Sequence, residues 1–465
     1  MKQNWTGQKI LIIGAARQGL SLARYLAARG AQIILNDQRT PEQMESVIQS
    51  FQAQITGTQI NWALGSHPLE LLDHADLVCV SGGVPLTLPI VAEARRRGLP
   101  LTNDSQIFID EVQAPVIGIT GSAGKTTTTT LVGRMAEAYA AETGRKAWVG
   151  GNIGLPLVEY VDQIQPDDLV IVEFSSFQLE LMTTSPHISA VLNITPNHLD
   201  RHGTLEAYSA AKARILQFQN EQDTAVLNRE DSGAWALSAL VRGDLVSYGR
   251  RRPAACAGTF INDDRLYFTS GSQDTELMPR SMVMLRGEHN LLNVLAAAAI
   301  ASAAGFPVEA IQAGVRGFGG AAHRLEYVGS VRGVAWYNDS IATAPERVIA
   351  GIQAFDEPLV LLLGGRDKDL PWEKLAELVH QRVDHVIVFG EAAEKILRAI
   401  GSLRPGSRLK TVNHQEKFEG AVQAAAKVAE PGSVVLLSPG GTSYDEFKDF
   451  EERGEWFRKW VQALS

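Results

Sequence analysis

The sequence predicts three consecutive α/β domains, each built on a mostly parallel sheet. Two observations lead to this class. The chain has 465 residues, which corresponds to about three domains at roughly 150 residues each. Short apolar runs, each followed by a glycine or polar residue and then by a helical pattern, recur along the whole chain. That alternation is typical of βαβ units.

Residues 1–111 are predicted to form the first, Rossmann-like domain. Lys9–Ile13 is a short apolar run that a glycine follows, a helical pattern then ends at Gly30, and Ala31–Leu35 is a second apolar run. Strand, glycine turn, helix and strand make one βαβ unit of a parallel sheet. Leu77–Val80, which precedes Ser-Gly-Gly, predicts a further strand with a tight turn.

Residues 112–320 and 321–465 are predicted to form the central and C-terminal domains. The expected central elements are strands within Pro115–Thr120, Leu169–Val172 and Ala190–Ile194 and a helix over Asn290–Ala304. Buried strands of the C-terminal domain are expected at Leu359–Leu363, His385–Phe389 and Ser433–Leu437. The glycine-rich Gly314–Gly320 predicts a hinge or linker between the two domains.

Composition excludes several classes of protein. The formal net charge of -9 disfavours a nucleic-acid binder, which would carry a basic face. The two cysteines, Cys79 and Cys256, lie far apart and form neither a disulfide framework nor a zinc motif. No apolar stretch reaches the roughly 18 residues of a membrane span, and residues 1–9 are polar. We therefore expect a cytoplasmic protein without a membrane segment.

Gly118–Thr127 has the composition of a phosphate-binding loop. Its sequence is Gly-Ile-Thr-Gly-Ser-Ala-Gly-Lys-Thr-Thr, and it follows an apolar run. Glycines let backbone N–H groups approach phosphate oxygens, Lys125 supplies a positive charge to the β- and γ-phosphates, and the Thr126 hydroxyl can bind Mg²⁺. Five residues separate Gly118 from Gly124, one more than the general pattern allows. The loop predicts ATP or GTP binding.

A second glycine loop, Gly14–Gly19, is a weaker signal. Ala16 replaces the middle glycine of G-x-G-x-x-G, where the backbone of a dinucleotide-binding loop touches the pyrophosphate. A nicotinamide cofactor is therefore not expected. A loop for another phosphorylated ligand and a purely structural turn both stay open.

A series of motifs resembles the Mur ligases, which build the peptidoglycan stem peptide. They follow the phosphate loop in the family's order: Gly151–Gly154, Glu173–Leu179, Asn193–Asp200, Ala211-Lys212, His289–Asn293, His323–Glu326, Asn338–Ser340 and Ser438–Phe447. The resemblance covers nearly the whole chain. Ser175–Leu179 and Ser443–Phe450 look most like the member that adds D-glutamate. The resemblance implies an N-terminal UDP-binding Rossmann-like domain, a central P-loop-like ATPase domain and a C-terminal Rossmann-like domain that binds the amino acid.

The resemblance also implies roles for residues of the central domain. Lys125, Glu173, His198 and Lys212 would be the catalytic residues. The predicted ATP-binding set is Gly121, Ser122, Ala123, Gly124, Lys125, Thr126, Thr127, Asn290, Asn293, Arg324 and Asp339. Thr126, Glu173, His198 and Lys212 would bind metal, with two Mg²⁺ ions expected. The lysine that matches Lys212 carries a CO₂-derived carbamate in the family, which requires a neutral amine.

The substrates follow from the same resemblance. UDP-N-acetylmuramoyl-L-alanine would bind Asp37, Gln38, Arg39, Ser81, Gly83 and Asn152. The acceptor amino acid, glutamate, would bind Thr343, Lys368, Ser443 and Phe450. Family members are generally monomers. The implied reaction is the ATP-dependent addition of D-glutamate through an acyl phosphate, in peptidoglycan precursor synthesis.

One position departs from the family pattern. Members that add D-glutamate commonly read Asp-Ser-Lys-Ala-Thr where this chain has Asp339-Ser340-Ile341-Ala342-Thr343. Isoleucine cannot pair with the carboxylate of a glutamate. Arg347 and Arg366 are candidates to replace the missing charge. D-glutamate remains the expected acceptor, with L-glutamate or another amino acid as the alternative.

Three other readings stay open until they are tested. A folylpolyglutamate-type ligase or another Mur ligase would use the same ATP chemistry, but the UDP-type first domain argues against the folate substrate. A nicotinamide-dependent oxidoreductase would need the middle glycine that Ala16 replaces. A nucleotide-driven motor would give no reason for His198 and Lys212.

Overall fold

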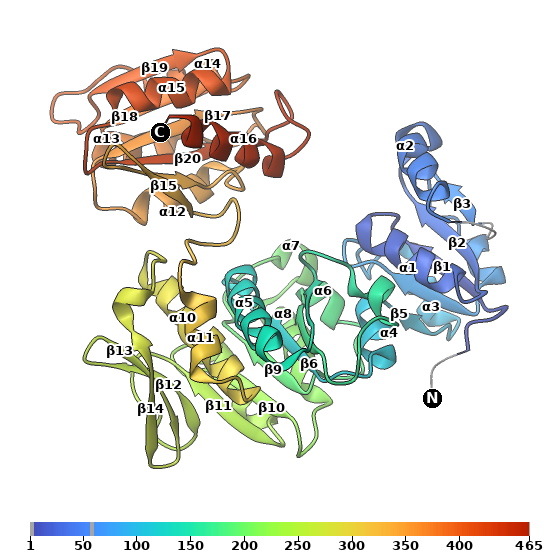
Figure 1. Cartoon of the computed structure of the whole chain (residues 1–465). Helices are drawn as coiled ribbons and strands as arrows, with labels where there is room; N and C mark the ends of the chain where they lie inside the picture. The colour runs from blue at the N-terminus through green and yellow to red at the C-terminus, as the bar shows by residue number, and fades with distance from the viewer. Residues whose placement is uncertain (1–3, 56–59, 465) are drawn as a thin grey trace. The chain divides into compact units, whose positions relative to one another are not determined.

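A computed structural model describes residues 4–55 and 60–464 (Figure 1). The chain forms two compact units. One unit extends to Val283 and includes Glu288–Arg316, and the other comprises Met284–Gly287 and the chain from Gly317 onward. The predicted α/β class is confirmed, because parallel strands alternate with helices through most of the chain.

The N-terminal sheet is wholly parallel and has the strand order β3-β2-β1-β4-β5. Its strands are β1 (Lys9–Ile13), β2 (Gln32–Asp37), β3 (Asn61–Leu64), β4 (Leu77–Val80) and β5 (Leu101–Thr102). The connecting helices are α1 (Arg17–Ala27), α2 (Pro41–Gln52), the 3-10 helix η1 (Leu69–His74), α3 (Pro89–Arg96) and α4 (Asp104–Glu111). Ile10 and Ile12 enter one buried cluster while Leu11 and Ile13 enter another. Both faces of the sheet are therefore covered, which explains the continuous apolar runs.

The central sheet has nine strands in the order β14-β13-β12-β11-β10-β9-β6-β8-β7. They are β6 (Val116–Thr120), β7 (Ala147–Gly151), β8 (Leu169–Glu173), β9 (Ile188–Val191), β10 (Thr224–Asn228), β11 (Asp244–Tyr248), β12 (Ala257–Asn262), β13 (Arg265–Ser270) and β14 (Gln273–Pro279). Its α-helices are α5 (Lys125–Thr143), α6 (Ser176–Leu179), α7 (Leu199–His202), α8 (Leu205–Gln217), α9 (Ser232–Ala236), α10 (Glu288–Ala303) and α11 (Val308–Val315). Its 3-10 helices are η2 (Leu157–Tyr160), η3 (Leu237–Leu240) and η4 (Arg280–Met282).

Two details of the central region differ from the sequence expectation. The last three strands form an antiparallel meander, β12-β13-β14, at one edge of the sheet, and only parallel units had been predicted. Gly314 belongs to helix α11, so the predicted linker Gly314–Gly320 is helical at its start.

The C-terminal sheet has the order β15-β16-β20-β17-β18-β19. Its strands are β15 (Glu326–Val331), β16 (Val334–Asn338), β17 (Leu359–Gly364), β18 (His385–Phe389), β19 (Thr411–Gln415) and β20 (Val434–Gly440). The helices are α12 (Pro345–Gln353), α13 (Glu373–Arg382), α14 (Ala393–Ile400), α15 (Phe418–Val428) and α16 (Phe450–Ala463). The β17 and β18 strands contain two of the predicted apolar runs, and β20 covers the third, Ser433–Leu437, from Val434 onward. These three strands are neighbours within the sheet.

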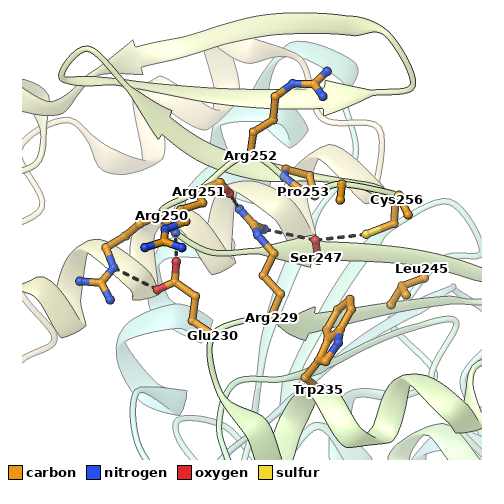
Figure 2. A pocket seen from close by; sticks show the side chains of 12 residues that line it. Arg229, Glu230, Trp235, Leu245, Ser247, Arg250, Arg251, Arg252, Pro253 and Cys256 are labelled. Carbon is orange, nitrogen blue, oxygen red and sulfur yellow. Dashed lines mark hydrogen bonds and ion pairs between the residues drawn. The ribbon is translucent and has the colours of Figure 1, made fainter.

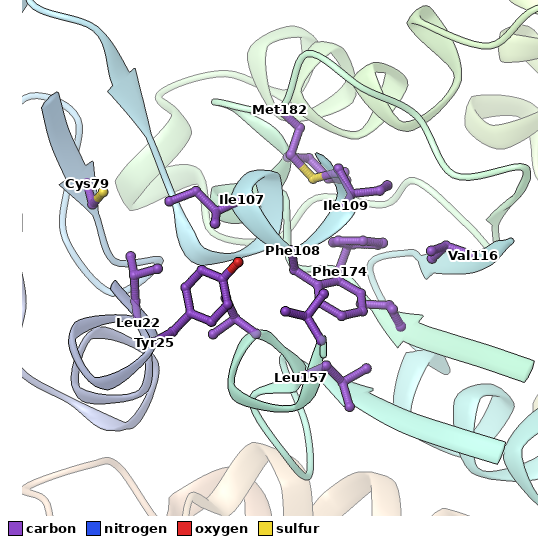
Figure 3. Packing of buried hydrophobic residues seen from close by; sticks show 14 of the residues in the cluster. Leu22, Tyr25, Cys79, Ile107, Phe108, Ile109, Val116, Leu157, Phe174 and Met182 are labelled. Carbon is purple, nitrogen blue, oxygen red and sulfur yellow. The ribbon is translucent and has the colours of Figure 1, made fainter. Parts of the chain in front are cut away.

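Helix α4 joins the N-terminal and central sheets through one continuous core. Figure 3 shows Phe108 of this helix between Tyr25 of α1 and Phe174, which follows β8. Polar contacts reinforce the junction, since Gln178 donates to Ser105 Oγ at 2.8 Å and Arg24 pairs with Glu159 at 2.6 Å. The first two sheets therefore share a hydrophobic core.

Candidate active site

The phosphate loop connects β6 to α5, which is the predicted context. Gly124 caps the helix in the left-handed conformation, with φ of +82°, and Lys125 is the first helical residue. The helix N-terminus directs free N–H groups toward the loop, as an anion site requires. Lys125 Nζ donates to the carbonyl oxygens of Gly121 at 2.8 Å and Ser122 at 3.4 Å. Thr126 and Thr127 occupy the first turn of α5.

Two residues of the segment after β9 brace this loop. Asn193 accepts from the Ala123 N–H at 2.8 Å and donates to the Ala123 carbonyl at 3.0 Å. The Ser122 hydroxyl donates to the Thr195 carbonyl at 3.0 Å and accepts from the Thr195 N–H at 2.9 Å. The sequence assigned no role to Asn193 or Thr195, although both belong to a recognised motif. A hydrogen bond between a side chain and a distant loop produces no periodic pattern in a single sequence.

Asn290 and Asn293 lie on α10 beside the phosphate loop, as their predicted role requires. Asn293 Nδ2 donates to Asn290 Oδ1 at 3.0 Å. A Cβ at Gly124 would lie 2.3 Å from Asn293 Oδ1. The asparagine pair therefore lies against the loop. It leaves no room at position 124 for a residue larger than glycine.

Glu173 is buried at the end of β8. Its Oε1 accepts from Asn152 Nδ2 at 2.8 Å. Its Oε2 is buried and has no hydrogen-bond partner in the described part of the chain. An unpartnered buried carboxylate oxygen costs free energy unless a cation or donor satisfies it. Glu173 therefore has a free ligand position of the kind that Mg²⁺ uses.

Lys212 is only 1% exposed, although it lies on helix α8. Its Nζ donates to the Gly121 carbonyl at 2.9 Å and to Thr120 Oγ1 at 3.4 Å. Burial, reinforced by the positive charge of Lys125, lowers the pKa of Lys212 to about 6, against an opposing effect of Glu173. The amine is therefore largely neutral at pH 7. Lys212, Lys125 and Glu173 surround the same loop.

His198 is the N-terminal capping residue of helix α7 and has the left-handed conformation, with φ of 52°. Burial and the charge of Lys125 lower its pKa, against an opposing effect of Asp200. The imidazole is therefore neutral at pH 7, the form that binds metal. No cluster of three or more His, Cys, Asp or Glu side chains suited to a metal occurs within residues 4–55 and 60–464. The predicted metal site contains only two residues of these types, Glu173 and His198. Its other two members are Thr126 and Lys212, so the site would not belong to such a cluster.

Most of the predicted UDP residues lie at or just after the C-terminal ends of two strands of the N-terminal sheet, Asp37, Gln38 and Arg39 at β2 and Ser81 and Gly83 at β4, whereas Asn152 follows β7 of the central sheet. Asp37 accepts from the Ala15 N–H at 2.8 Å and pairs with Arg39 at 2.8 Å, which lowers the pKa of Asp37 strongly. Ser81 donates to the Gly14 carbonyl at 2.9 Å. Gln38 is exposed after β2.

The turn after β4 faces the central domain. Arg201 of α7 donates to the Gly83 carbonyl at 3.2 Å, and Arg17 of α1 donates to the Asn152 carbonyl at 3.1 Å. These two hydrogen bonds connect the N-terminal domain with α7 and with the segment after β7, where Asn152 contacts Glu173.

The predicted acceptor residues lie together in the other unit. Lys368 Nζ donates to Thr343 Oγ1 at 3.2 Å. Ser340 donates to the Phe450 carbonyl at 2.8 Å. Ser443 is buried in the segment between β20 and α16. Of the two candidates to replace a lysine at Ile341, Arg366 pairs with Glu391 at 2.8 Å and Arg347 donates to the Ile341 carbonyl at 3.3 Å.

Asp339 and Arg324 belong to this second unit as well. Asp339 accepts from Ser438 Oγ at 2.9 Å and from the Leu325 N–H at 3.2 Å. Burial raises its pKa to about 7. His323 and Leu325, on either side of Arg324, have positive φ of 62° and 43°. Such backbone strain in non-glycine residues concentrates at functional sites.

Arg453 is a residue that the sequence did not single out. It is fully buried on α16, and burial lowers its pKa to about 10. Its guanidinium donates to the Ser340 hydroxyl and carbonyl and to the Gly441 and Thr442 carbonyls. Arg453 therefore holds the predicted acceptor segments together. A single arginine in an amphipathic helix carries no sequence signal for this role.

A cavity of about 900 Å³ lies elsewhere in the central domain, between β11, α9 and the loop that follows β11 (Figure 2). Arg229, Trp235, Ser247 and Cys256 are among the residues that line it, and none of the predicted site residues does. Arg229 donates to the carbonyls of Gly249 and Thr259. Its role there is to hold the loop after β11.

No helix within the described residues is long and apolar enough to cross a membrane. Three family models match successive segments of the chain. Residues 8–103 match the Mur ligase MurD-like N-terminal domain, 119–301 the Mur ligase middle domain, and 323–441 the Mur ligase glutamate ligase domain. The predicted three-domain architecture is thereby confirmed, while the bounds 1–111, 112–320 and 321–465 stay a prediction.

Curated relatives match over the full length. The UDP-N-acetylmuramoylalanine--D-glutamate ligase of Symbiobacterium thermophilum is 39% identical over 98% of both chains. That of Pelotomaculum thermopropionicum is 37% identical over 100% of this chain and 99% of its own.

Solved structures agree in fold. MurC of Thermotoga maritima is 18% identical, with a TM-score of 0.54 over 98% of this chain and 100% of its own. MurF of Acinetobacter baumannii is 17% identical, with a TM-score of 0.55 over 99% of this chain and 91% of its own. The chain belongs to the Mur ligase family, on its MurD branch.

Proposed function

We propose that this chain is an ATP-dependent ligase that joins D-glutamate to the carboxylate of UDP-N-acetylmuramoyl-L-alanine in peptidoglycan precursor synthesis. The observation that carries the proposal is the full-length identity of 37–39% to proteins with that name. Lys125, Glu173 and Lys212 around one phosphate loop supply the groups that the reaction needs. We place the reaction in the cytoplasm, where ATP is available, and expect a monomer.

The reaction has two steps. A carboxylate oxygen of the UDP-linked substrate attacks the γ-phosphorus of ATP, so that ADP leaves and an acyl phosphate forms. The amine of the amino acid then attacks the acyl carbon, inorganic phosphate leaves, and the amine loses a proton. Two anions meet in the first step, and Lys125 with the N–H groups of the loop would neutralise the transferred phosphoryl group.

Mg²⁺ fits the residues that are present. The unpartnered Glu173 Oε2 and the neutral His198 imidazole are suitable ligands, and Thr126 lies at the start of α5. Bound there, Mg²⁺ would supply positive charge against the phosphate oxygens. Glu173, His198, Thr126 and a modified Lys212 would hold two ions.

A carbamate on Lys212 fits its surroundings. The neutral amine attacks CO₂, a C–N bond forms, and one proton is released. The lowered pKa of Lys212 keeps the amine neutral near pH 7. The carbamate would replace a neutral buried amine beside the Lys125 cation with an anion, which Lys125 attracts, and would add an oxygen ligand for Mg²⁺.

The acceptor carboxylates would meet Lys368, Thr343, Ser443 and the N-terminal end of α16 at Phe450. Lys368 is exposed and its Nζ lies 3.2 Å from Thr343 Oγ1. Ile341 has no charge that could pair with the side-chain carboxylate of the acceptor. We therefore expect the protein to select amino acids by this carboxylate less strongly. This departure is the reason to keep L-glutamate or another amino acid as the second candidate.

The test is a phosphate-release assay of the purified protein. UDP-N-acetylmuramoyl-L-alanine and ATP are supplied with D-glutamate, L-glutamate or no amino acid, and the product is identified by mass. We expect turnover with D-glutamate alone, and none from the Lys125→Ala variant.

Turnover with L-glutamate or another amino acid alone would replace the acceptor and keep the ligase reaction. Absence of phosphate release with every acceptor would refute the proposed function. A screen with the precursors of the other Mur ligases and with a folate would then identify a different substrate class.

A further inference from the structure

Ser176 and Glu180 contact the two ring nitrogens of His202 beside the candidate active site, and we call these three residues the relay. Ser176 Oγ lies 2.9 Å from His202 Nε2, and His202 Nδ1 lies 3.2 Å from Glu180 Oε1. The imidazole is 1% exposed. Ser176 begins α6 and Glu180 caps its end, whereas His202 is the last residue of α7. The relay therefore ties these two short helices together.

Two polar contacts fix the orientation of the His202 ring. Nε2 shares a hydrogen bond with the Ser176 hydroxyl, and Nδ1 faces the Glu180 carboxylate. A ring with its N–H on Nδ1 presents that N–H to the carboxylate and leaves Nε2 to accept from the Ser176 hydroxyl.

The same imidazole lies at the centre of an aromatic cluster. Phe177 stacks on it with ring centroids 5.1 Å apart and an interplanar angle of 6°. Phe177 also meets His198 edge-on at 5.3 Å. The Tyr208 ring meets the His202 ring edge-on with centroids 5.1 Å apart, and Lys212 Nζ lies 4.7 Å from the centre of the Tyr208 ring. His202 is thus one side chain removed from both His198 and Lys212.

The backbone gives a second connection to His198. The N–H groups of Arg201 and His202 both donate to the His198 carbonyl at 3.0 Å. His198 has a positive φ of 52°, a conformation that costs a non-glycine residue about 1–2 kcal/mol unless its surroundings hold it. A fixed α7 would hold it, and the relay fixes α7.

We propose that His202, held by Ser176 and Glu180, is a positioning residue that sets the orientation of His198 and Lys212 for the ligase reaction. The inference rests on the proposed function. Glu173 lies three residues before Ser176, so the relay joins the segments that carry Glu173 and His198, which are adjacent only in the folded chain. Loss of the relay should misplace these side chains and leave the ATP loop intact.

The test compares His202→Ala, Ser176→Ala and Glu180→Gln with the exposed control His414→Ala on β19. Melting temperature, ATP affinity by calorimetry, and kcat and KM for each substrate are measured. We expect His202→Ala to lower kcat by about 10–100-fold, the range for partners that orient ligand side chains. ATP affinity should change less than threefold. Imidazole added at millimolar concentration should restore part of kcat.

Ser176→Ala and Glu180→Gln keep most of the packing, so they test the relay even where His202→Ala fails to fold. Both should lower kcat more than His414→Ala at an unchanged melting temperature. Wild-type kcat in both variants would overturn the proposal. Loss of kcat in strict proportion to lost folded protein, without rescue by imidazole, would also overturn it. An inactive wild-type protein would instead refute the proposed function itself.

Discussion

At the scale of single residues, burial determines which protonation state of an ionisable side chain is favoured. A helical lysine is by default a solvated cation, and for Lys212 only the family resemblance implied a neutral amine. The fold places its amine against the Gly121 carbonyl at 1% exposure. The resulting loss of hydration favours the neutral amine, and the neighbouring charge of Lys125 acts in the same direction.

Replacement of Lys212 by alanine tests this reading of the site. We expect activity to fall by a factor on the order of 100 or more, since an oxygen ligand for Mg²⁺ would be lost. Small carboxylic acids should restore part of the activity by supplying the oxygen. The matched control is Lys427→Ala, an exposed lysine on helix α15, which should leave kcat unchanged. Full activity of Lys212→Ala would contradict the proposed role.

Gly124 shows a second residue-scale constraint. Alanine there would meet Asn293 Oδ1 at 2.3 Å and would also adopt a positive φ. We expect Gly124→Ala to raise the KM for ATP at least tenfold and to lower the free energy of unfolding by about 1–3 kcal/mol. Gly144→Ala at the other end of α5 has the same strain, with φ of +74°, but nothing within 4 Å. It should lose about 1 kcal/mol without any change in ATP binding. Equal KM values in the two variants would show that contact with Asn293 is irrelevant.

At the scale of elements, periodic and apolar patterns predicted the central strands well. The β6, β8, β17 and β18 strands lie where continuous apolar runs stand, because a strand covered on both faces needs apolar residues throughout. The meander β12-β13-β14 was missed. In its first turn, Asp263 and Asp264 have φ of 46° and 56°, as in a type I′ hairpin. The sequence Asn-Asp-Asp at this turn is the local pattern that could have predicted the hairpin.

Helix α4 offers an element-scale prediction on pH. Burial raises the pKa of Asp104 to about 6, and its Oδ1 has no hydrogen-bond partner among the described residues. The folded state therefore binds a proton that the unfolded state has already lost between roughly pH 4 and 6. Stability contributed by this group is present below pH 4 and is lost as the pH rises through 6.

Asp104→Asn should remove this dependence. We expect the variant to gain about 1–3 kcal/mol of unfolding free energy at pH 7 and to lose most of the slope that this group adds between pH 4 and 6. Urea denaturation at several pH values measures both quantities. The exposed Asp167→Asn serves as control. A variant that is less stable than wild type at pH 7 would show that the Asp104 carboxylate is stabilising.

At the scale of the whole molecule, the unit that contains the first two sheets depends on a shared core. Phe108 is 3% exposed and packs among residues from both sheets. We expect Phe108→Ala to lower the unfolding free energy of this unit by about 3–5 kcal/mol and to leave the C-terminal unit unchanged. Scanning calorimetry resolves the two transitions. Phe218→Ala, at a residue that is 37% exposed, is the control. A loss below about 1 kcal/mol for Phe108→Ala would show that the two sheets do not depend on this core.

The sequence by itself determined the fold class, the phosphate loop and the set of candidate residues. These depend on local signals: apolar runs, glycines at a loop before a helix, and motifs in a fixed order. Lys125, Asn293 and Glu173 were found in this way, and the structure places all three in one unit around the loop and the strand ends.

Only the tertiary structure decided what these residues can do. The neutral amine of Lys212, the open oxygen of Glu173, the brace from Asn193 and the relay through His202 each depend on groups far apart in the chain. Desolvation and hydrogen bonding act between atoms that folding brings within about 3–5 Å. A single sequence records which residues are present, but it does not record which of them are buried together.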